Sequence, residues 1–279
     1  MAHSRNKILL IVEGEKTEPK LFEQLGKVKW NQSSELQIVD IRTNIYSLYQ
    51  SILNLNEGFI DDSTSTIEVL RQILINNGRI EDAKRLEDKY PYIYLFFDLE
   101  IQDNHYENKK SVLKEMMNYF YDETENGLLL INYPMIESYR DYKEPLIDPN
   151  YRDLFVKVVD VLNKKYKSIV NLRGTNRNFS KYTTKEFELL FLQNLLKANH
   201  ILGNDFIAPE YDSFEKIIMG QSVLEKQFEY ITTENKIAVL CTCLFVFVYY
   251  YGKGYYEKLV NDNCAITKKH KNNELVKKL

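Results

Sequence analysis

KILLIVEGEKTEP, residues 7–19, changes character abruptly after Val12. The largely apolar run before that point is typical of a strand buried on both faces, as in a parallel sheet. An acidic turn begins at Glu13, and a helix is predicted to follow it, with Thr17 as candidate N-cap and Pro19 in the first turn. The chain is therefore expected to open with a strand, an acidic turn and a helix.

Two later apolar runs also end in polar or acidic residues. YIYLFF, residues 92–97, is followed by Asp98 and Glu100, and GLLLI, residues 127–131, precedes a segment that contains Glu137. Ligand sites in parallel α/β sheets lie beyond the carboxyl ends of the strands. The sequence therefore predicts that acids from several strand ends gather at one edge of a sheet.

Strands and helices alternate through the first half of the chain. The other elements expected there are a strand at 36–41 and helices at 44–54, 66–76, 80–89 and 111–121. This alternation indicates an α/β, Rossmann-like domain with a parallel sheet, assigned to residues 1–150. Residues 151–279 are predicted to form a mainly helical C-terminal region, with helices at 153–165, 184–202, 213–230 and 235–251.

The acid pattern suits a hard metal ion. Asp98 and Glu100 are two residues apart and share one side of an extended chain, and Glu13 adds a third carboxylate. Mg²⁺ prefers such oxygen ligands, and a cation would offset the repulsion among them. A bound cation could polarise a phosphodiester and orient a water molecule. Glu13 acting as general base and Glu13 acting as a further ligand both remain open.

Acids at strand ends also have an ordinary explanation, as solvated loop residues or helix caps. It accounts well for Glu15 and Glu18, which lie at the start of a predicted helix, where the dipole favours anions. Phosphate contacts are expected from Lys16 and from a basic, aromatic-flanked loop that contains Arg173 and Arg177, although an ordinary solvated loop explains that segment equally well.

Composition excludes several classes of protein. A net charge of −3 argues against a wholly basic nucleic-acid binder, and three cysteines form neither a disulfide framework nor a zinc pattern. The N-terminus does not resemble a signal peptide. Residues 237–251 carry no charge but are shorter than the ~20 residues that a membrane span needs, so a buried helix is expected. The interpretation is a cytoplasmic protein without a membrane segment.

IVEGEKTEPK, residues 11–20, combined with FDLEIQD, residues 97–103, resembles the Toprim domain of topoisomerases, primases and OLD-type nucleases. It is more particularly similar to anti-phage Toprim effectors: RloB-like proteins, AbiL and the nuclease subunit of the PARIS system. The resemblance spans roughly residues 7–140. It implies phosphodiester cleavage with Mg²⁺ or Mn²⁺.

The resemblance also implies roles for individual residues. Glu13 matches the invariant glutamate of the family, and Asp98 and Glu100 match its acid pair. The family has Asp where this chain has Glu100, so the metal would sit differently, or Asp103 could share the role. Glu137 matches a further acid that follows a proline. His105, close to the acid pair, is an additional candidate.

Proteins of this group are often encoded beside an ABC-type ATPase, which holds the nuclease silent until a phage product is sensed, and PARIS-like members cut tRNA. This chain has no Walker A string, so ATP use would come from a partner. A homo-oligomer is compatible with the resemblance. Two alternatives stay open: a primase-like or topoisomerase-like Toprim enzyme, and a binding or regulatory subunit with a degenerate site.

Overall fold

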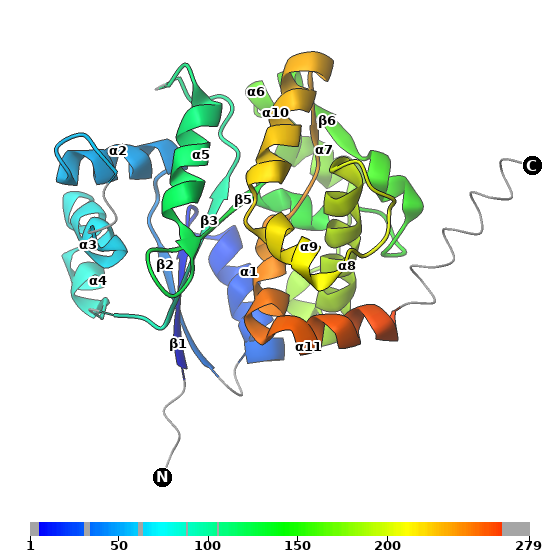
Figure 1. Ribbon diagram of the computed structural model, residues 1–279, viewed down its shortest axis with the longest axis horizontal. Helices are drawn as coiled ribbons and strands as arrows, with labels where there is room; N and C mark the ends of the chain where they lie inside the picture. Colours follow the sequence, from blue (N-terminus) through cyan, green and yellow to red (C-terminus); the bar gives the residue numbers. More distant parts are fainter. Residues whose placement is uncertain (1–5, 31–33, 61–63, 88, 105, 264–279) are drawn as a thin grey trace, which may run out of the picture. The chain divides into compact units, whose positions relative to one another are not determined.

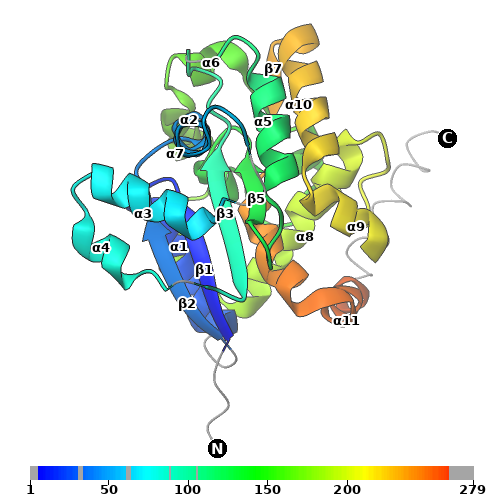
Figure 2. The ribbon, with the colours of Figure 1, turned by 60° about the vertical axis from the view of Figure 1, so that its left-hand side comes forward.

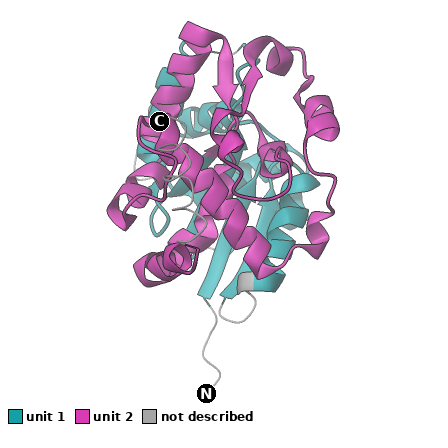
Figure 3. Cartoon of the chain, turned by 90° about the vertical axis from the view of Figure 1, so that its right-hand side faces the viewer, with its two compact units in different colours: residues 1–130 teal, residues 131–279 magenta. Residues whose placement is uncertain are grey.

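The computed structural model describes residues 6–30, 34–60, 64–87, 89–104 and 106–263, and the chain divides into two units, residues 1–130 and 131–279 (Figure 3). The division falls earlier than the expected boundary at residue 150. The reason is visible just after it. Tyr133 and Leu240 exchange backbone hydrogen bonds of 2.8 Å in both directions, which joins this segment to the C-terminal unit.

The five-stranded sheet has the order β2-β1-β3-β5-β4 (Figure 2). Its strands are β1 (Asn6–Val12), β2 (Ser34–Asp40), β3 (Tyr92–Asp98), β4 (Tyr121–Asp122) and β5 (Gly127–Asn132). Strand β1 runs parallel to both of its neighbours, β2 and β3, and the short β4 is antiparallel to its partner β5. The predicted α/β fold with a mostly parallel sheet is confirmed.

The apolar runs of the sheet explain its position in the core. Residues 8–12 of β1 are fully buried, so both faces of the strand must be covered. Helix α1 (Thr17–Leu25) packs on the sheet through Phe22, whose ring centroid lies 4.3 Å from that of Phe96 on β3. Thr17 is the first helical residue and not the cap. Lys16 occupies the cap position, without a side-chain cap bond.

A short π-helix (Gly26–Trp30) continues α1, and longer helices follow in the first unit (Figure 1). They are α2 (Ile45–Leu55), α3 (Thr66–Asn76), α4 (Ile80–Arg85) and α5 (Lys109–Tyr119). Helix α2 begins at a true cap, because the Asn44 side chain accepts a 2.9 Å hydrogen bond from the Ser47 N–H. Helix α4 ends earlier than expected, at Arg85.

The second unit is mainly helical, as predicted, although a small sheet interrupts it. Its helices include α6 (Val158–Leu162), α7 (Tyr166–Arg173), α8 (Thr184–Ile201), α9 (Tyr211–Ile218), α10 (Gln221–Glu234) and α11 (Val246–Asp262). Helix α8 matches its prediction closely and starts with a capping box between Thr183 and Glu186. One predicted helix, 213–230, is two helices, because Gly220 adopts a left-handed conformation between them.

Two predicted helices, at 153–165 and 235–251, were wrong over their first residues. Strands β6 (Phe155–Lys157) and β7 (Lys236–Ala238) form an antiparallel pair there. The Gln227 side chain supports β7 by bonding both the N–H and the carbonyl of Ala238, at 3.0 and 2.9 Å. Residues 237–248 are buried, as expected, whereas Tyr249, Tyr250 and Tyr251 at the end of the apolar stretch are partly exposed. Within the described residues, no helix combines the length and apolar character that crossing a bilayer requires.

Gly127 provides a test of the packing in the sheet. It has φ +112°, and an added Cβ would lie 2.6 Å from Leu95 Cδ1 and 3.0 Å from Ile93 Cγ2. We expect Gly127→Ala to lower the free energy of unfolding by about 3 kcal/mol in urea denaturation, from backbone strain plus overpacking. The matched control is Gly78→Ala, where φ is +72° but the space is open. It should cost only about 1 kcal/mol, and equal losses would contradict the packing argument.

Candidate functional site

The topology of the sheet singles out the edge between β1 and β3. From β1 the chain passes to β2 on one side, whereas β3 lies on the other side of β1. Ligands in open α/β sheets bind outside the carboxyl ends of the strands at such a switch point. Glu13 directly follows β1, and Asp98 is the last residue of β3. The structure thus brings these two predicted site residues together.

Glu13 is the electrostatic centre of this edge. Its Oε2 accepts a 3.1 Å hydrogen bond from the Asp98 backbone N–H, and its carboxyl is also hydrogen-bonded with that of Glu100. Burial raises the pKa of Glu13 from its usual 4.5 to about 8, and the negative charges of Glu100 and Glu18 act in the same direction. A hydrogen bond between two carboxyl groups needs a proton on one of them. This agrees in direction with the raised pKa of Glu13.

Glu18 lies closer to this centre than the sequence suggested. Its side chain is buried and accepts a 3.2 Å hydrogen bond from the Gly14 N–H. A Cβ on residue 14 would lie 2.8 Å from the Glu18 carboxylate, so a side chain there would displace Glu18 from its bond to the backbone. Glu18 therefore shapes the acidic turn as well as beginning a helix, whereas Glu15 is exposed, as expected.

The loop after β3 holds the remaining predicted acids of the first unit. Gln102 donates from its side-chain amide to Glu100. Asp103 accepts a 2.9 Å hydrogen bond from Asn44, the residue that caps α2. Asp103 is thus fixed by the start of a helix, and Glu100 is the acid that reaches Glu13. His105 lies outside the described residues.

Sequence reasoning missed Tyr46, on the first turn of α2. Its hydroxyl is buried and has no hydrogen-bond partner among the residues that the structure describes. Burial raises the pKa of Tyr46 well above its usual value, and the charges of Asp103 and Glu100 add to the effect. The hydroxyl is therefore a neutral donor near the acids. Tyr46 lies within a predicted helix and not at a strand end, so no signal in the sequence identified it.

At the end of β2, Asp40 forms ion pairs with arginines, as expected of an acid with a structural role. Asp40 is paired with Arg79, whose two Nη atoms each lie 3.1 Å from one carboxylate oxygen, and with Arg42 at 2.8 Å. The strongest charge effects on Glu13, in contrast, come from two other acids. Arg42 also lies 3.2 Å from Glu15, and the largely exposed Lys16 lies 3.8 Å from it.

The residues present fit a hard divalent cation in chemistry. Within the described ranges no three Asp, Glu, His or Cys side chains form a group arranged to hold a metal ion. Mg²⁺ is usually bound through only one or two carboxylates, with water and substrate oxygens as its other ligands. The half-buried Glu13 and Glu100 supply two carboxylates whose mutual repulsion a cation would relieve, and Asp98 adjoins them.

Three predicted site residues belong to the second unit, each with its own surroundings. Glu137 is buried, with Oε1 3.0 Å from Lys167 Nζ and Oε2 without a hydrogen-bond partner in the described structure. Arg173 forms a two-pronged ion pair with Asp141. The third, Arg177, pairs with a glutamate of α8 and lies over a tyrosine ring. The expected phosphate contacts of Arg173 and Arg177 stay predictions.

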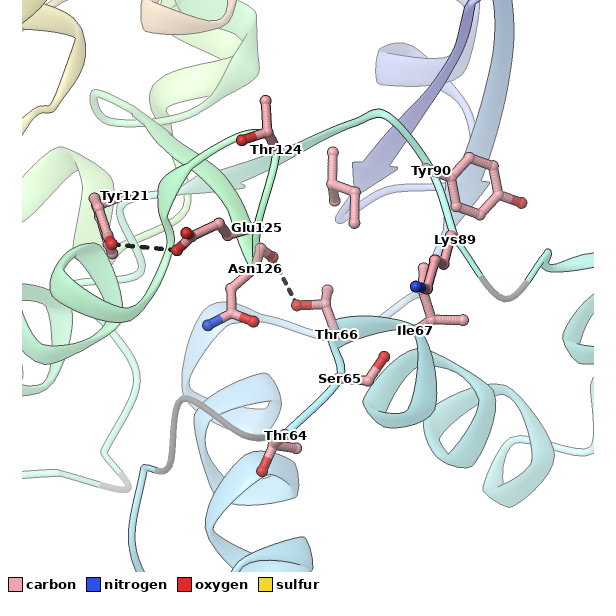
Figure 4. A pocket seen from close by; sticks show the side chains of 11 residues that line it. Thr64, Ser65, Thr66, Ile67, Lys89, Tyr90, Tyr121, Thr124, Glu125 and Asn126 are labelled. Carbon is pink, nitrogen blue, oxygen red and sulfur yellow. Dashed lines mark hydrogen bonds between the residues drawn. The ribbon is translucent and has the colours of Figure 1, made fainter.

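The first unit also has a cavity of about 580 Å³, drawn in Figure 4. Its lining includes Tyr90 and Ile93, near the start of β3, so it lies at the opposite end of that strand from Asp98. Two hydrogen bonds join residues that line it: Tyr121 donates to Glu125 at 3.2 Å, and Thr66 donates to the Asn126 carbonyl at 2.6 Å (Figure 4). The acid edge and this cavity are therefore separate features.

No protein-family model matches the chain, and neither a curated protein nor a solved structure matches it. The resemblance to Toprim nucleases therefore rests on the motif residues themselves. The site is defined by its own geometry: Glu13, Asp98 and Glu100 at the switch point of a parallel sheet.

The raised pKa of Glu13 predicts how stability depends on pH. The unfolded chain releases this proton near pH 4.5, whereas the folded protein keeps it until about pH 8. The contribution of Glu13 is therefore fully present below pH 4.5 and is lost as pH rises to about 8. In chelator-containing buffer, we expect the free energy of unfolding to fall over this range by a few kcal/mol, at about 1.4 kcal/mol per unit of pKa shift.

Urea titrations of variants at several pH values check this expectation. Glu13→Gln should remove most of the decline, because the amide has no proton to release. Glu15→Gln, an exposed neighbour in the same turn, is the matched control and should decline like the wild type. An undiminished decline in Glu13→Gln would refute the assignment of the shifted group.

Proposed function

We propose that this chain is a metal-dependent phosphodiesterase that cleaves RNA or DNA at the acid edge of its sheet. The observation that carries the proposal is the Glu13–Glu100 carboxyl pair beside the Asp98 N–H, at the topological switch point. Two carboxyl groups in contact repel each other when both are charged, and each is costly to shield from water. A site that recruits a cation explains the arrangement.

In this proposal each acid has a distinct task. Asp98 and Glu100 would hold the divalent cation, which when bound supplies Lewis-acid polarisation of a phosphodiester oxygen. Glu13 would accept the proton of the attacking water, because the Asp98 N–H fixes one of its oxygens and orients the other. Glu18 would keep the turn in shape through the Gly14 N–H. Tyr46 would donate a hydrogen bond to the site.

Cations for a polyanionic substrate are present near the acidic turn. Lys16 is exposed, and the Arg42 side chain is about half exposed, with both near Glu15. Phosphate groups bind such side chains through charge-assisted hydrogen bonds. This local positive charge would offset a chain with a net charge of −3. Arg42 is an addition to the predicted substrate contacts.

A role in anti-phage abortive infection is a proposal that rests on the motif resemblance alone. It includes cleavage of tRNA, silencing by an ABC-type ATPase partner and a homo-oligomeric form. The competing proposal, a binding or regulatory subunit with a degenerate site, is favoured by the hydrogen-bonded Glu13–Glu100 pair, which neutralises itself without a metal. The two proposals make opposite predictions for catalysis and for metal binding.

Cleavage assays with the purified chain test the catalytic role. With Mg²⁺ or Mn²⁺, we expect cleavage of tRNA, single-stranded RNA or plasmid DNA, and a loss of about 10²-fold or more in Glu13→Gln, as for removal of a general base. Glu15→Gln should retain activity. Equal activity of wild type and Glu13→Gln would refute the role of Glu13, and a chain inactive on every substrate would favour the regulatory proposal.

Calorimetry tests the metal site independently of the substrate. Because Glu13 keeps its proton at pH 7, binding of Mg²⁺ or Mn²⁺ should release close to one proton, measured as a dependence of the binding heat on the buffer's ionisation enthalpy. Asp98→Asn and Glu100→Gln should each weaken binding about tenfold or more. Glu15→Gln should leave it unchanged. Absence of binding, or binding without proton release, would contradict the proposed site.

A further inference from the structure

The C-terminal unit contains a segment with excess positive charge. Residues 140–181 hold ten lysines and arginines against five acids, although the whole chain has a net charge of −3. Arg173 of this segment is already paired with Asp141. Arg177 is paired with Glu186. Three lysines lie close together elsewhere in the segment, in and just after the turn that joins α6 to α7.

This turn is a Schellman motif with lysine in the position that usually holds glycine. The Lys165 N–H bonds the Asp160 carbonyl at 2.8 Å. The Lys164 N–H bonds the Val161 carbonyl at 2.9 Å. Lys164 has φ +56°, in the left-handed region that glycine adopts without strain and other residues adopt rarely. The backbone therefore favours glycine at this position, and local structure does not explain the lysine side chain.

The three lysines of the turn, Lys164, Lys165 and Lys167, are exposed. The side chains of Lys164 and Lys165 form no hydrogen bond or ion pair with any residue that the structure describes. Lys165 is the N-cap of α7 without a side-chain cap bond, and the first turn of this helix holds no acid. The helix dipole disfavours cations at this end, so the lysines do not stabilise the helix. A negatively charged partner would relieve the repulsion among them.

The positive charge continues along α7. Lys167 and Asn171 are four residues apart and share one face of the helix. Arg140 donates a 2.7 Å hydrogen bond to the neutral Asn171 amide, which places its guanidinium on that face. The nearest acid is the buried Glu137, 3.0 Å from Lys167, whose side chain stays 63% exposed. Within the described residues, Asp160 of α6 forms no ion pair with these cations, so positive charge prevails.

Exposed aliphatic side chains flank this basic stretch. Val159 and Leu162 of α6 are 53% and 47% exposed, and Leu172 of α7 is 89% exposed. A lipid surface would take up a continuous apolar face. Between Leu162 and Leu172, however, every side chain classed as exposed is polar or charged. This interruption favours a polyanion bound through its charges over a membrane surface.

We propose that the three lysines of residues 164–167, together with Arg140, bind the phosphate backbone of a nucleic-acid strand. This inference rests on the proposed function, because it gives the nucleic-acid substrate a contact surface on the C-terminal unit. Lysine binds phosphate as a point charge, and phosphate contacts position a strand without reading its bases. The surface therefore holds strands of any sequence.

Fluorescence anisotropy on the full chain tests the proposal, with a labelled single-stranded RNA and EDTA to prevent cleavage. Lys164→Gln/Lys165→Gln should weaken binding about tenfold and reduce the slope of log K against log salt concentration by about 1.4, as for two lost contacts to a single strand. Lys216→Gln/Lys258→Gln, which removes two exposed lysines from α9 and α11, is the matched control and should bind like the wild type. Equal binding by the two double variants overturns the proposal.

Lys164→Gly separates binding from folding. Glycine suits the left-handed turn, so the urea midpoint should stay the same or rise. RNA binding should nevertheless weaken, with a reduction of the salt slope by about 0.7 for one lost contact. Binding by Lys164→Gly that equals that of the wild type overturns the proposal.

Two other probes identify the source of the phosphate. Adenosine monophosphate should bind far more weakly than the RNA, because one phosphate meets only part of the surface. Anionic lipid vesicles should bind the wild type and Lys164→Gln/Lys165→Gln equally. Tight binding of the mononucleotide, or a loss of vesicle binding with unchanged RNA binding, overturns the proposal.

Cleavage by the same proteins distinguishes this inference from the proposed function. If the wild type cleaves RNA while the lysine variants bind it normally, the basic surface is refuted and the phosphodiesterase stands. If RNA binds through these lysines but the wild type cleaves nothing with Mg²⁺ or Mn²⁺, the basic surface stands and the phosphodiesterase is refuted.

Discussion

The parallel register between β1 and β3 is the constraint on which the candidate site depends. It aligns Val12 with Phe96, so that the next residues of the two strands leave the sheet together. The Asp98 N–H then reaches the Glu13 carboxylate at 3.1 Å. A slip of one residue would reverse the faces of a strand buried on both sides and would also separate these groups. The stability of the core and the geometry of the site therefore share one cause.

The acids at the ends of β1, β2 and β3 have different partners. Asp40 is neutralised by Arg79 and Arg42, so it serves the fold. Glu13 and Glu100 contact each other, and the negative charge of Glu100 contributes to the raised pKa of Glu13. Two carboxyl groups in contact raise the pKa of Glu13, whereas two arginines neutralise Asp40. That difference is the physical reason for proposing a function at this edge and not at the end of β2.

In the second unit, helix α8 places several polar side chains in the buried core. Asn194 is well satisfied: it accepts from Tyr151 and from the Cys241 N–H and donates to the Leu190 carbonyl. Lys197 donates to the Leu154 carbonyl, and burial lowers its pKa well below the usual value. Of these three side chains, Gln193 is the one with an unpaired donor in the described structure, its Nε2.

The sequence by itself determined the α/β class, the positions of β1, β3 and β5, and the acids that follow them, because apolar runs of strand length and their polar ends are local patterns. It misassigned residues 155–157 and 236–238, where pairing between distant segments made strands from apparently helical sequence. Only the tertiary structure decided that Glu100 is the acid that meets Glu13, that Asp103 is bound to Asn44, and that Tyr46 lies near them. These contacts join residues far apart in the chain, and their geometry depends on strand register and helix packing, which no local pattern encodes.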